Sequence, residues 1–288
     1  MRVEAFLVNS FTADGTGGNP AGVVLQADNL SNEEKLEIAQ AVGYSETAFV
    51  SQDDEVDFEL SFFTVTDEVD FCGHATLAAF STMYRKGIVT EGQYIQRTKA
   101  GVLAVTVESD GHIVMEQKLP EYLGVFAAGD ISELIGIDST VLESTQLPIE
   151  VISTGLPDII VPVPLGYLDE IQVNDRLLSN FCQKHNVVGI HAFELCEKGS
   201  ELTASCRNFA PLFGIPEESA TGSASGALAC YLTKHFPGEH SNCFTFEQGR
   251  AMGCVSRITA SVELNEQVIL KVMVGGFADE IGLKEVSL

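Results

Sequence analysis

The two halves of the chain carry the same short motifs in the same order, and this internal repeat constrains the fold more than any other feature. The segment "FFTVTDEVDFCGHATLAAFSTMYRKG" in the first half matches "NFAPLFGIPEESATGSASGALACYLTKH" in the second. Each reads as an aromatic strand end, an acidic turn, Ala-Thr and a helix of small residues. The match separates Thr76 from Thr221 by 145 residues, about half the chain.

Two further matches follow the same order. "SETAFV" aligns with "GIHAFEL", which pairs Phe49 with Phe193 at a separation of 144, and the turn at Pro20 aligns with that at Pro157 at a separation of 137. One short match arises by chance, but three at nearly one offset indicate a duplicated structural unit.

The repeat therefore predicts two pseudo-symmetric lobes with a cleft between them. We place the N-terminal lobe at 1–118 and the C-terminal lobe at 119–288, with the last C-terminal residues as candidates to complete the N-terminal lobe. Residues 55–65 alternate apolar and polar side chains, and hairpin patterns surround Asp110-Gly111 and Asn265-Glu266, so strands dominate. A helix is expected after the capping residue Ser31, and the predicted fold class is α+β.

The charge of the chain excludes several classes of partner. The sequence has 41 acidic and 16 basic residues, a net charge of −25, which repels nucleic acids and anionic membranes. Its start lacks the pattern of a signal peptide and no apolar run is long enough to cross a bilayer, so we expect a soluble, cytoplasmic protein. The seven cysteines form no C-x-x-C pair and no nucleotide-binding motif occurs, so no metal site and no cofactor is predicted.

The start of the small-residue helix in each half is the expected binding site for a small anionic substrate. The first N–H groups of a helix have no partner within it, and together with the helix dipole they attract carboxylates. A structural interpretation, two central packing helices, also fits such residues. The candidate substrate-binding residues are Asn19, Ser45, Gly73, Ala75, Thr221 and Gly222.

Glu46 is the residue that breaks the symmetry of the two halves. It lies among small and apolar residues, and the offset of 144 places Ile190 at the equivalent position. We expect desolvation to raise the pKa of this carboxyl toward the range useful for proton transfer. The further candidate catalytic residues are His74, Glu218 and Ser223, whereas His112, His185, His191, His235 and His240 are interpreted as structural.

Cys72 has weaker support as a catalytic residue. A racemase with two thiols needs a second cysteine in "ESATGS", and that segment has none. A nucleophilic pair of Cys72 with His74 is disfavoured, because residues so close in a turn rarely point at one another in the geometry that activates a thiolate. Two alternatives to an isomerase stay open: a racemase or epimerase that uses Glu46 with Cys72, and a protein that binds a metabolite or partner without chemistry.

An ordered set of motifs across nearly the whole chain resembles the phenazine-biosynthesis PhzF-like family. The set is "SFTADGTGGNPAGVVL", "GYSETAFV", "FFTVTDEVDFCGHATLAAF", "STGLPDIIVPV", "RNFAPLFGIPEESATGSASGALACYL" and "EQGRAMGCVSRI". The resemblance implies a diaminopimelate epimerase-like fold, in which each lobe is a curled, mostly antiparallel sheet around a central helix. It also implies subunit association, with a homodimer as the expected state.

The same resemblance implies isomerisation by a proton shift without a cofactor. Glu46 would be the acid-base group, with His74, Glu218 and Ser223 as the other polar groups and the backbone of Gly73 and Gly222 near the substrate carboxylate. The chain departs from the family pattern in "EESATGS", where Glu218 and Ser219 replace Asp-Pro, and in "GCVS", where the family often has Gly-Arg-Pro-Ser. We therefore expect a substrate other than the phenazine precursor.

Overall fold

The chain divides into two compact units. In this computed structural model, residues 1–237 and 242–288 are described, so His240 lies outside the described residues. The first unit comprises 1–116 together with 275–288, and the second comprises 117–274. Among the helices of the described ranges, none is both long and apolar enough to span a bilayer.

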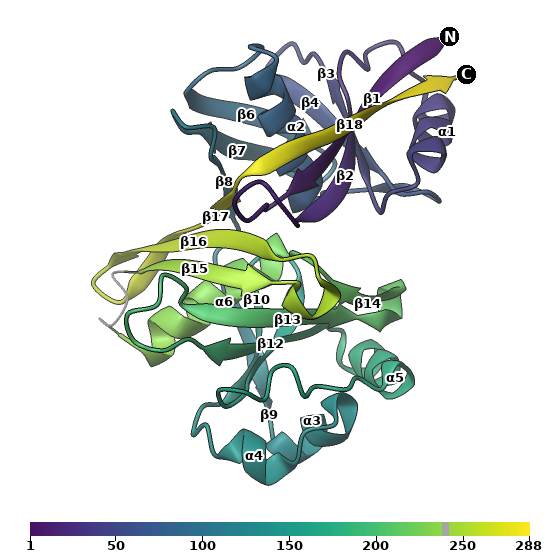
Figure 1. The fold of residues 1–288 in the computed structure, drawn as a ribbon. Coiled ribbons are helices and arrows are strands. Elements are labelled where there is room, and N and C mark those ends of the chain that lie inside the picture. The colour runs from purple at the N-terminus through teal and green to yellow at the C-terminus, as the bar shows by residue number, and fades with distance from the viewer. Residues whose placement is uncertain (238–241) are drawn as a thin grey trace. The chain divides into compact units, whose positions relative to one another are not determined.

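The first unit is a mixed sheet with helix α2 packed against it. The strands are β1 (Arg2–Ser10), β2 (Asn19–Val24), β3 (Thr47–Ser51), β4 (Phe58–Phe63), β5 (Glu68–Val69), β6 (Gly92–Thr98), β7 (Gly101–Val107), β8 (Ile113–Gln117) and β18 (Ala278–Ser287), with helices α1 (Asn32–Val42) and α2 (Gly73–Arg85). The pairs β2–β3 and β4–β6 are parallel, whereas β18–β1, β1–β2, β3–β4, β6–β7 and β7–β8 are antiparallel. Figure 1 shows the yellow C-terminal strand β18 running beside the purple N-terminal strand β1.

The second unit repeats this plan. Its strands are β9 (Glu121–Phe126), β10 (Ile149–Ser153), β11 (Pro157–Pro162), β12 (Gly189–Leu195), β13 (Ala204–Ala210), β14 (Ile215–Glu218), β15 (Cys243–Gln248), β16 (Ser256–Asn265) and β17 (Val268–Gly276). The helices are α3 (Ala128–Ile135), α4 (Ser139–Glu143), α5 (Asp175–His185) and α6 (Gly222–His235), with 3-10 turns at Pro211–Phe213 and Arg250–Met252. The successive pairs β10–β11, β12–β13 and β15–β16 are antiparallel, whereas β11–β12 and β13–β15 are parallel.

That order of pairings is the order found from β1 through β2, β3, β4, β6 and β7, so the repeat read from the sequence is present in the topology. The register of the Ala-Thr match is wrong, however. Helices α2 and α6 begin at Gly73 and Gly222, so Thr76 corresponds to Ser225 rather than to Thr221. The side chains agree: Thr76 donates to the carbonyl of Cys72 and Ser225 to that of Thr221, each four residues back.

The match of Phe49 with Phe193 fails for a different reason. Phe49 packs in the core beneath α1, whereas the ring of Phe193 contacts Tyr231 of α6 at 5.5 Å. Side chains on a strand alternate between faces, so the two phenylalanines occupy opposite faces of corresponding strands. Ile190 belongs to the core beneath α5, so it is not the counterpart of Glu46; His191 shares the α6-facing side of β12 with Phe193.

Several local predictions are confirmed. In β4, Leu60 and Phe62 are buried while Glu59 is exposed, and β7 and β8 form the hairpin around Asp110-Gly111. Ser31 caps α1 in a reciprocal capping box, and Gly43 ends that helix in the left-handed conformation.

Candidate active site

Glu46 is fixed at the point where the chain enters β3. Its carbonyl accepts a hydrogen bond from the amide of Gly22 in β2 at 3.0 Å. Gly22 permits this close approach, because a Cβ there would lie 2.7 Å from Oγ1 of Thr47. The first turn of α2 lies on the same side, so the Glu46 side chain extends toward that helix, and 18% of it is exposed.

His74 of α2 meets that carboxylate. Its Nε2 lies 3.2 Å from Oε2 of Glu46, and its own carbonyl accepts a 2.6 Å hydrogen bond from the hydroxyl of Ser10 in β1. The contact with Glu46 has the distance of an ion pair but not the alignment of a hydrogen bond, so Oε2 is a buried acceptor without a hydrogen-bond donor among the described residues. The sequence placed these two residues in one site, and the structure brings them together.

Cys72 also contacts the ring of His74. Its Sγ lies 3.4 Å from Nδ1, so the two side chains are in contact, but burial raises the pKa of the thiol, so the contact does not indicate an activated thiolate. Cys72 is the N-cap residue of α2 with extended backbone angles, and this conformation allows its side chain to turn back over the first helical turn.

The neighbours of Glu46 reverse its expected pKa shift. Burial alone raises the pKa of Glu46, but the contacts with His74 and a hydrogen bond with Ser45 outweigh burial and lower it, which corrects the prediction of a raised value. Burial lowers the pKa of His74, but Cys72 and Glu46 overcome that effect and raise it, while burial raises the pKa of Cys72. A carboxylate beside an imidazolium and a neutral thiol is the state consistent with these directions.

The start of α2 lacks a side-chain cap of the usual kind. Cys72 makes no side-chain cap hydrogen bond there, and neither does Thr221 at the start of α6, whereas Ser31, Asp138 and Asn174 cap helices α1, α4 and α5. Uncapped N–H groups at a helix start are the donors that bind anions.

The remaining predicted residues of the first unit surround this start. Gly73 is its first residue, and Ala75 is fully buried behind it. Asn19 is 6% exposed and pairs in register with Ser10, the residue that holds His74.

In the second unit, Glu218 and Thr221 are joined through a residue that the sequence analysis did not identify. The hydroxyl of Thr221 donates to Oε2 of Glu218 at 2.5 Å, and the fully buried amide of Gln248 donates to the carbonyl of Glu218 and accepts from the amide of Thr221. Gly222 and Ser223 form the first turn of α6, where the carbonyl of Ser223 accepts from the hydroxyl of Thr154. The segment "EQGRAMG" gave no signal for Gln248, since a lone glutamine has no motif.

Asp158 is a further buried polar residue, which the sequence analysis did not identify, and it lies on the same face of the sheet as His191. With Asn208 and Glu218 they share, by strand register, the face of the sheet toward α6. Asp158 is 1% exposed, its Oδ1 has no hydrogen-bond partner in the described ranges, and burial together with the charge of Glu218 raises its pKa to about 8. His191 contacts Asn208 at 3.1 Å, and burial lowers its pKa to about 4, so the structural interpretation of this histidine fits.

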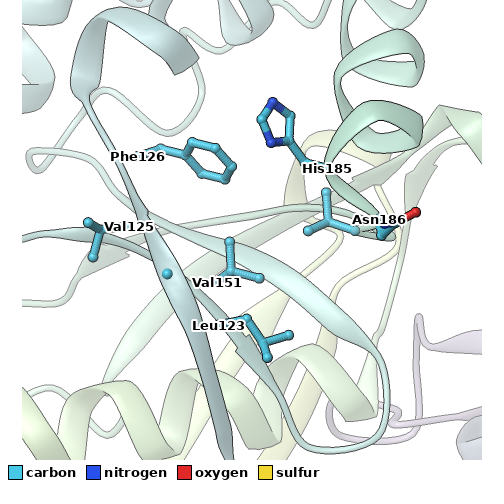
Figure 2. Close-up of a pocket in the computed structure, with 8 residues that line it drawn as sticks. Leu123, Val125, Phe126, Val151, His185 and Asn186 are labelled. Atoms are coloured by element: carbon cyan, nitrogen blue, oxygen red, sulfur yellow. The ribbon is translucent and has the colours of Figure 1, made fainter.

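A surface hollow lies elsewhere in the second unit (Figure 2). Its lining comes from β9, Val151 and the end of α5, on the face opposite α6. The ring of His185 packs on Phe126 and Phe181 at centroid distances of 5.0 and 4.4 Å, and the other lining side chains are apolar apart from Asn186. Such a lining offers packing rather than proton transfer, so the hollow is a poorer candidate for a catalytic site than the Glu46 pair.

A carboxylate in contact with an imidazole is an arrangement suited to acid-base chemistry, and comparisons with known proteins identify the family. Residues 8–280 match the family of phenazine biosynthesis-like proteins, PhzC-PhzF. The uncharacterized isomerase YfhB of Bacillus subtilis strain 168 is 34% identical over 279 residues, with 91% of each chain covered. The crystal structure of a PhzF-family phenazine biosynthesis protein of Bacillus anthracis superposes with a TM-score of 0.90 at 28% identity, and each chain is fully covered.

A third relative has a named reaction. The trans-2,3-dihydro-3-hydroxyanthranilate isomerase of Pseudomonas chlororaphis is 29% identical over 279 residues, with 94% of each chain covered. The chain thus belongs to the phenazine biosynthesis-like (PhzF) family, and it is an isomerase. The family and fold expected from the motifs are confirmed.

Proposed function

We propose that the protein isomerises a small unsaturated carboxylic acid without a cofactor, by moving a proton through the carboxyl group of Glu46. The observation that carries the proposal is the contact of this carboxylate with His74 at 3.2 Å beside the uncapped start of α2. A base and an anion-binding backbone are thereby within reach of one small molecule.

The chemistry follows from the charge state of the pair. Because its pKa is lowered, Glu46 is ionised at neutral pH and can accept a proton from carbon. His74 keeps the carboxylate oriented and, as an imidazolium, stabilises negative charge that develops nearby. The protonated Glu46 then returns the proton at another carbon of the same molecule, so one residue serves both steps.

The substrate class is inferred from the helix start and from one relative. The N–H groups of Gly73 and its neighbours suit a carboxylate, and the Pseudomonas relative is named for an unsaturated cyclic amino acid. We propose Glu218 and Ser223 as further polar groups for the substrate. Because Glu218 and Ser219 replace Asp-Pro, the substrate is expected to differ from that of the relative.

Solvent deuterium tests the proposal. The protein is incubated in D2O with a panel of unsaturated carboxylic acids that includes the substrate of the Pseudomonas relative, and label in the acid is followed by NMR. We expect wash-in that Glu46→Gln abolishes and that Glu37→Gln, at an exposed position on α1, preserves. Binding of an acid without wash-in would identify a non-catalytic binder instead, and wash-in retained by Glu46→Gln would refute the role of Glu46.

The contact of Cys72 with His74 favours one second candidate, an epimerase in which the thiol and Glu46 serve opposite faces of a carbon. The raised pKa of Cys72 opposes it, since a neutral thiol is a weak base. Undiminished activity of Cys72→Ser would eliminate this candidate.

A further inference from the structure

Three different metal-ligating atoms converge within the first unit. Sγ of Cys72, a ring nitrogen of His74 and a carboxylate oxygen of Glu46 all lie within 4.8 Å of one another. They come from the N-cap of α2, the first turn of α2 and the residue before β3. Two of the three are also fixed through their backbone, since the carbonyls of His74 and Glu46 each accept a hydrogen bond from a neighbouring strand.

The spacing of these atoms is close to that of a zinc coordination shell. A tetrahedral Zn²⁺ with ligand bonds of about 2.0 to 2.3 Å separates its ligand atoms by roughly 3.3 to 3.6 Å. Nε2 of His74 lies 3.2 Å from Oε2 of Glu46 and 3.9 Å from Sγ of Cys72. The third separation, between Sγ and the carboxylate oxygen, is no more than 4.8 Å, so one ion bound to Nε2 would reach the other two ligands after side-chain shifts of up to about an ångström.

The orientation of Oε2 also fits a shared ion. This oxygen is close to Nε2 yet out of line for a hydrogen bond with it, and the described residues supply no other donor. Two ligand atoms of one tetrahedral ion are close together but misaligned for a hydrogen bond, because the lone pair of each atom points at the metal rather than at the second ligand. A buried carboxylate oxygen without a donor is costly, and a metal ion would satisfy it.

The donor set selects the kind of metal. Thiolate, imidazole and carboxylate together suit Zn²⁺ or Co²⁺, whereas Mg²⁺ and Ca²⁺ prefer shells of oxygen ligands. Three protein ligands also leave a fourth position for water or a substrate carboxylate. The net charge of −25 attracts cations to the molecule as a whole.

We propose that Cys72, His74 and Glu46 bind one Zn²⁺ ion per chain, and that the bound ion blocks proton transfer by Glu46. Binding requires the thiolate of Cys72 and the neutral imidazole of His74, so the protons of both are released to solvent. The ion then occupies the carboxylate oxygen that faces His74. The binding site stands on the geometry alone, whereas the inhibition rests on the proposed function of Glu46.

Cobalt is the spectroscopic probe for this site. The full-length protein is freed of metals with a chelator, which is then removed, and is titrated with CoCl₂. We expect a thiolate-to-cobalt charge-transfer band and the visible bands of tetrahedral Co²⁺, saturating at one ion per chain and lost when Zn²⁺ is added. Cys72→Ser should remove the charge-transfer band, whereas Cys243→Ser, at an exposed thiol, should retain it.

Other outcomes of the titration would overturn the proposal. A protein that gives no charge-transfer band has no such site, and a band that survives in Cys72→Ser or disappears in Cys243→Ser belongs to another thiol. His74→Gln and Glu46→Gln should each weaken Co²⁺ binding at least tenfold, and unchanged affinity in both would also refute the site. Circular dichroism of each variant verifies its fold.

Activity then separates the two proposals. Stoichiometric Zn²⁺ should stop the deuterium wash-in of the native protein, and a chelator should restore it. If Glu46→Gln stays active while Co²⁺ binds as expected, the proposed function fails and the metal site stands. If Glu46→Gln is inactive but Co²⁺ gives no charge-transfer band with the native protein, the metal site fails and the function stands.

Discussion

At the residue scale, burial is the largest single influence on the pKa of Glu46, but the contacts with His74 and Ser45 together outweigh it. Sequence reasoning recognised an isolated carboxyl in apolar surroundings and expected burial to dominate. His74 is the nearest charged group, and it shifts the pKa of Glu46 in the opposite direction. The direction of this pKa shift could not be predicted from the sequence, because Glu46 and His74 are 28 positions apart and no pattern along the chain pairs them.

The pair makes a prediction about pH. Glu46 is the base only while ionised, so the rate should fall on the acid side as pH drops through its lowered pKa. In His74→Gln the counter-charge is gone while burial remains, and the acid limb of kcat/KM should move to higher pH. The pH dependence of deuterium wash-in measures this shift, with His235→Gln, a histidine paired with Glu150, as the control. An acid limb that stays in place in His74→Gln would show that His74 does not set the pKa of Glu46.

Asp158 gives a second prediction. Its pKa is about 8 in the folded chain, raised from 3.8 by burial first and by Glu218 second. Between these values the folded state holds a proton that the unfolded state has lost, so stability falls as pH rises from 4 to 8. Asp158→Asn removes the titrating group and with it this pH-dependent loss of stability, so it should stabilise the second unit near pH 7 by up to about 4 kcal/mol.

Urea unfolding of the Asp158→Asn variant and the native protein at pH 5 and pH 8 checks this. The stability difference should be larger at pH 8, and Asp54→Asn, at an exposed site, should show no such trend. An equal difference at both pH values would mean that Asp158 does not titrate as described.

At the element scale, α2 and α6 are corresponding helices built from small residues, and the space around them can be tested with glycines. A Cβ at Gly226 in α6 would lie 3.0 Å from Oγ1 of Thr154 and 3.3 Å from Val274, whereas one at Gly129 in α3 meets nothing within 4 Å. Gly226→Ala should therefore destabilise the chain by about 1 to 2 kcal/mol through overpacking. Gly129→Ala should stabilise it by about 0.5 to 1 kcal/mol through helix propensity.

Thermal unfolding of the two variants separates packing from propensity. If both substitutions stabilised the chain, the tight contact around Gly226 would not constrain α6, and helix propensity alone would account for the result. If both substitutions destabilised the chain, the space around Gly129 would not be open to a methyl group as described.

The elements were more predictable than their register. Alternation identified β4, turn residues identified the β7–β8 hairpin, and Ser31 marked the start of α1. The repeat gave the right succession of strands and helices, but Ala-Thr and lone phenylalanines carry no information about phase, so Thr76 was matched four residues out of step. The contact of Cys72 with His74 could not be predicted, because it depends on N-cap backbone angles, which residue types alone do not specify.

At the scale of the whole molecule, the C-terminal strand belongs to the N-terminal unit. Strand β18 pairs with β1 along its length, and Val286 packs with Ala5 and Phe49 in the core beneath α1. Removing residues 278–288 would expose the edge of β1 and open that core. The first unit should then lose its structure while the second keeps it.

Amide hydrogen exchange followed by mass spectrometry tests this for a chain truncated after Phe277. Protection should be lost in β1 and β2 and kept in β11 and β12. Addition of a synthetic peptide of residues 278–288 should restore it. Protection of β1 in the truncated chain without the peptide would show that the first unit does not depend on β18.

The pairing of β1 with β18 also has a consequence for how the protein is made. A ribosome delivers residues 1–116 first, but their sheet lacks its last strand until the whole of 117–274 has been synthesised. At about 5 to 20 residues per second, that interval is roughly 8 to 30 s. The second unit is continuous in sequence and can fold during this time, so the Glu46 site is expected to form last, once β18 is available to pair with β1.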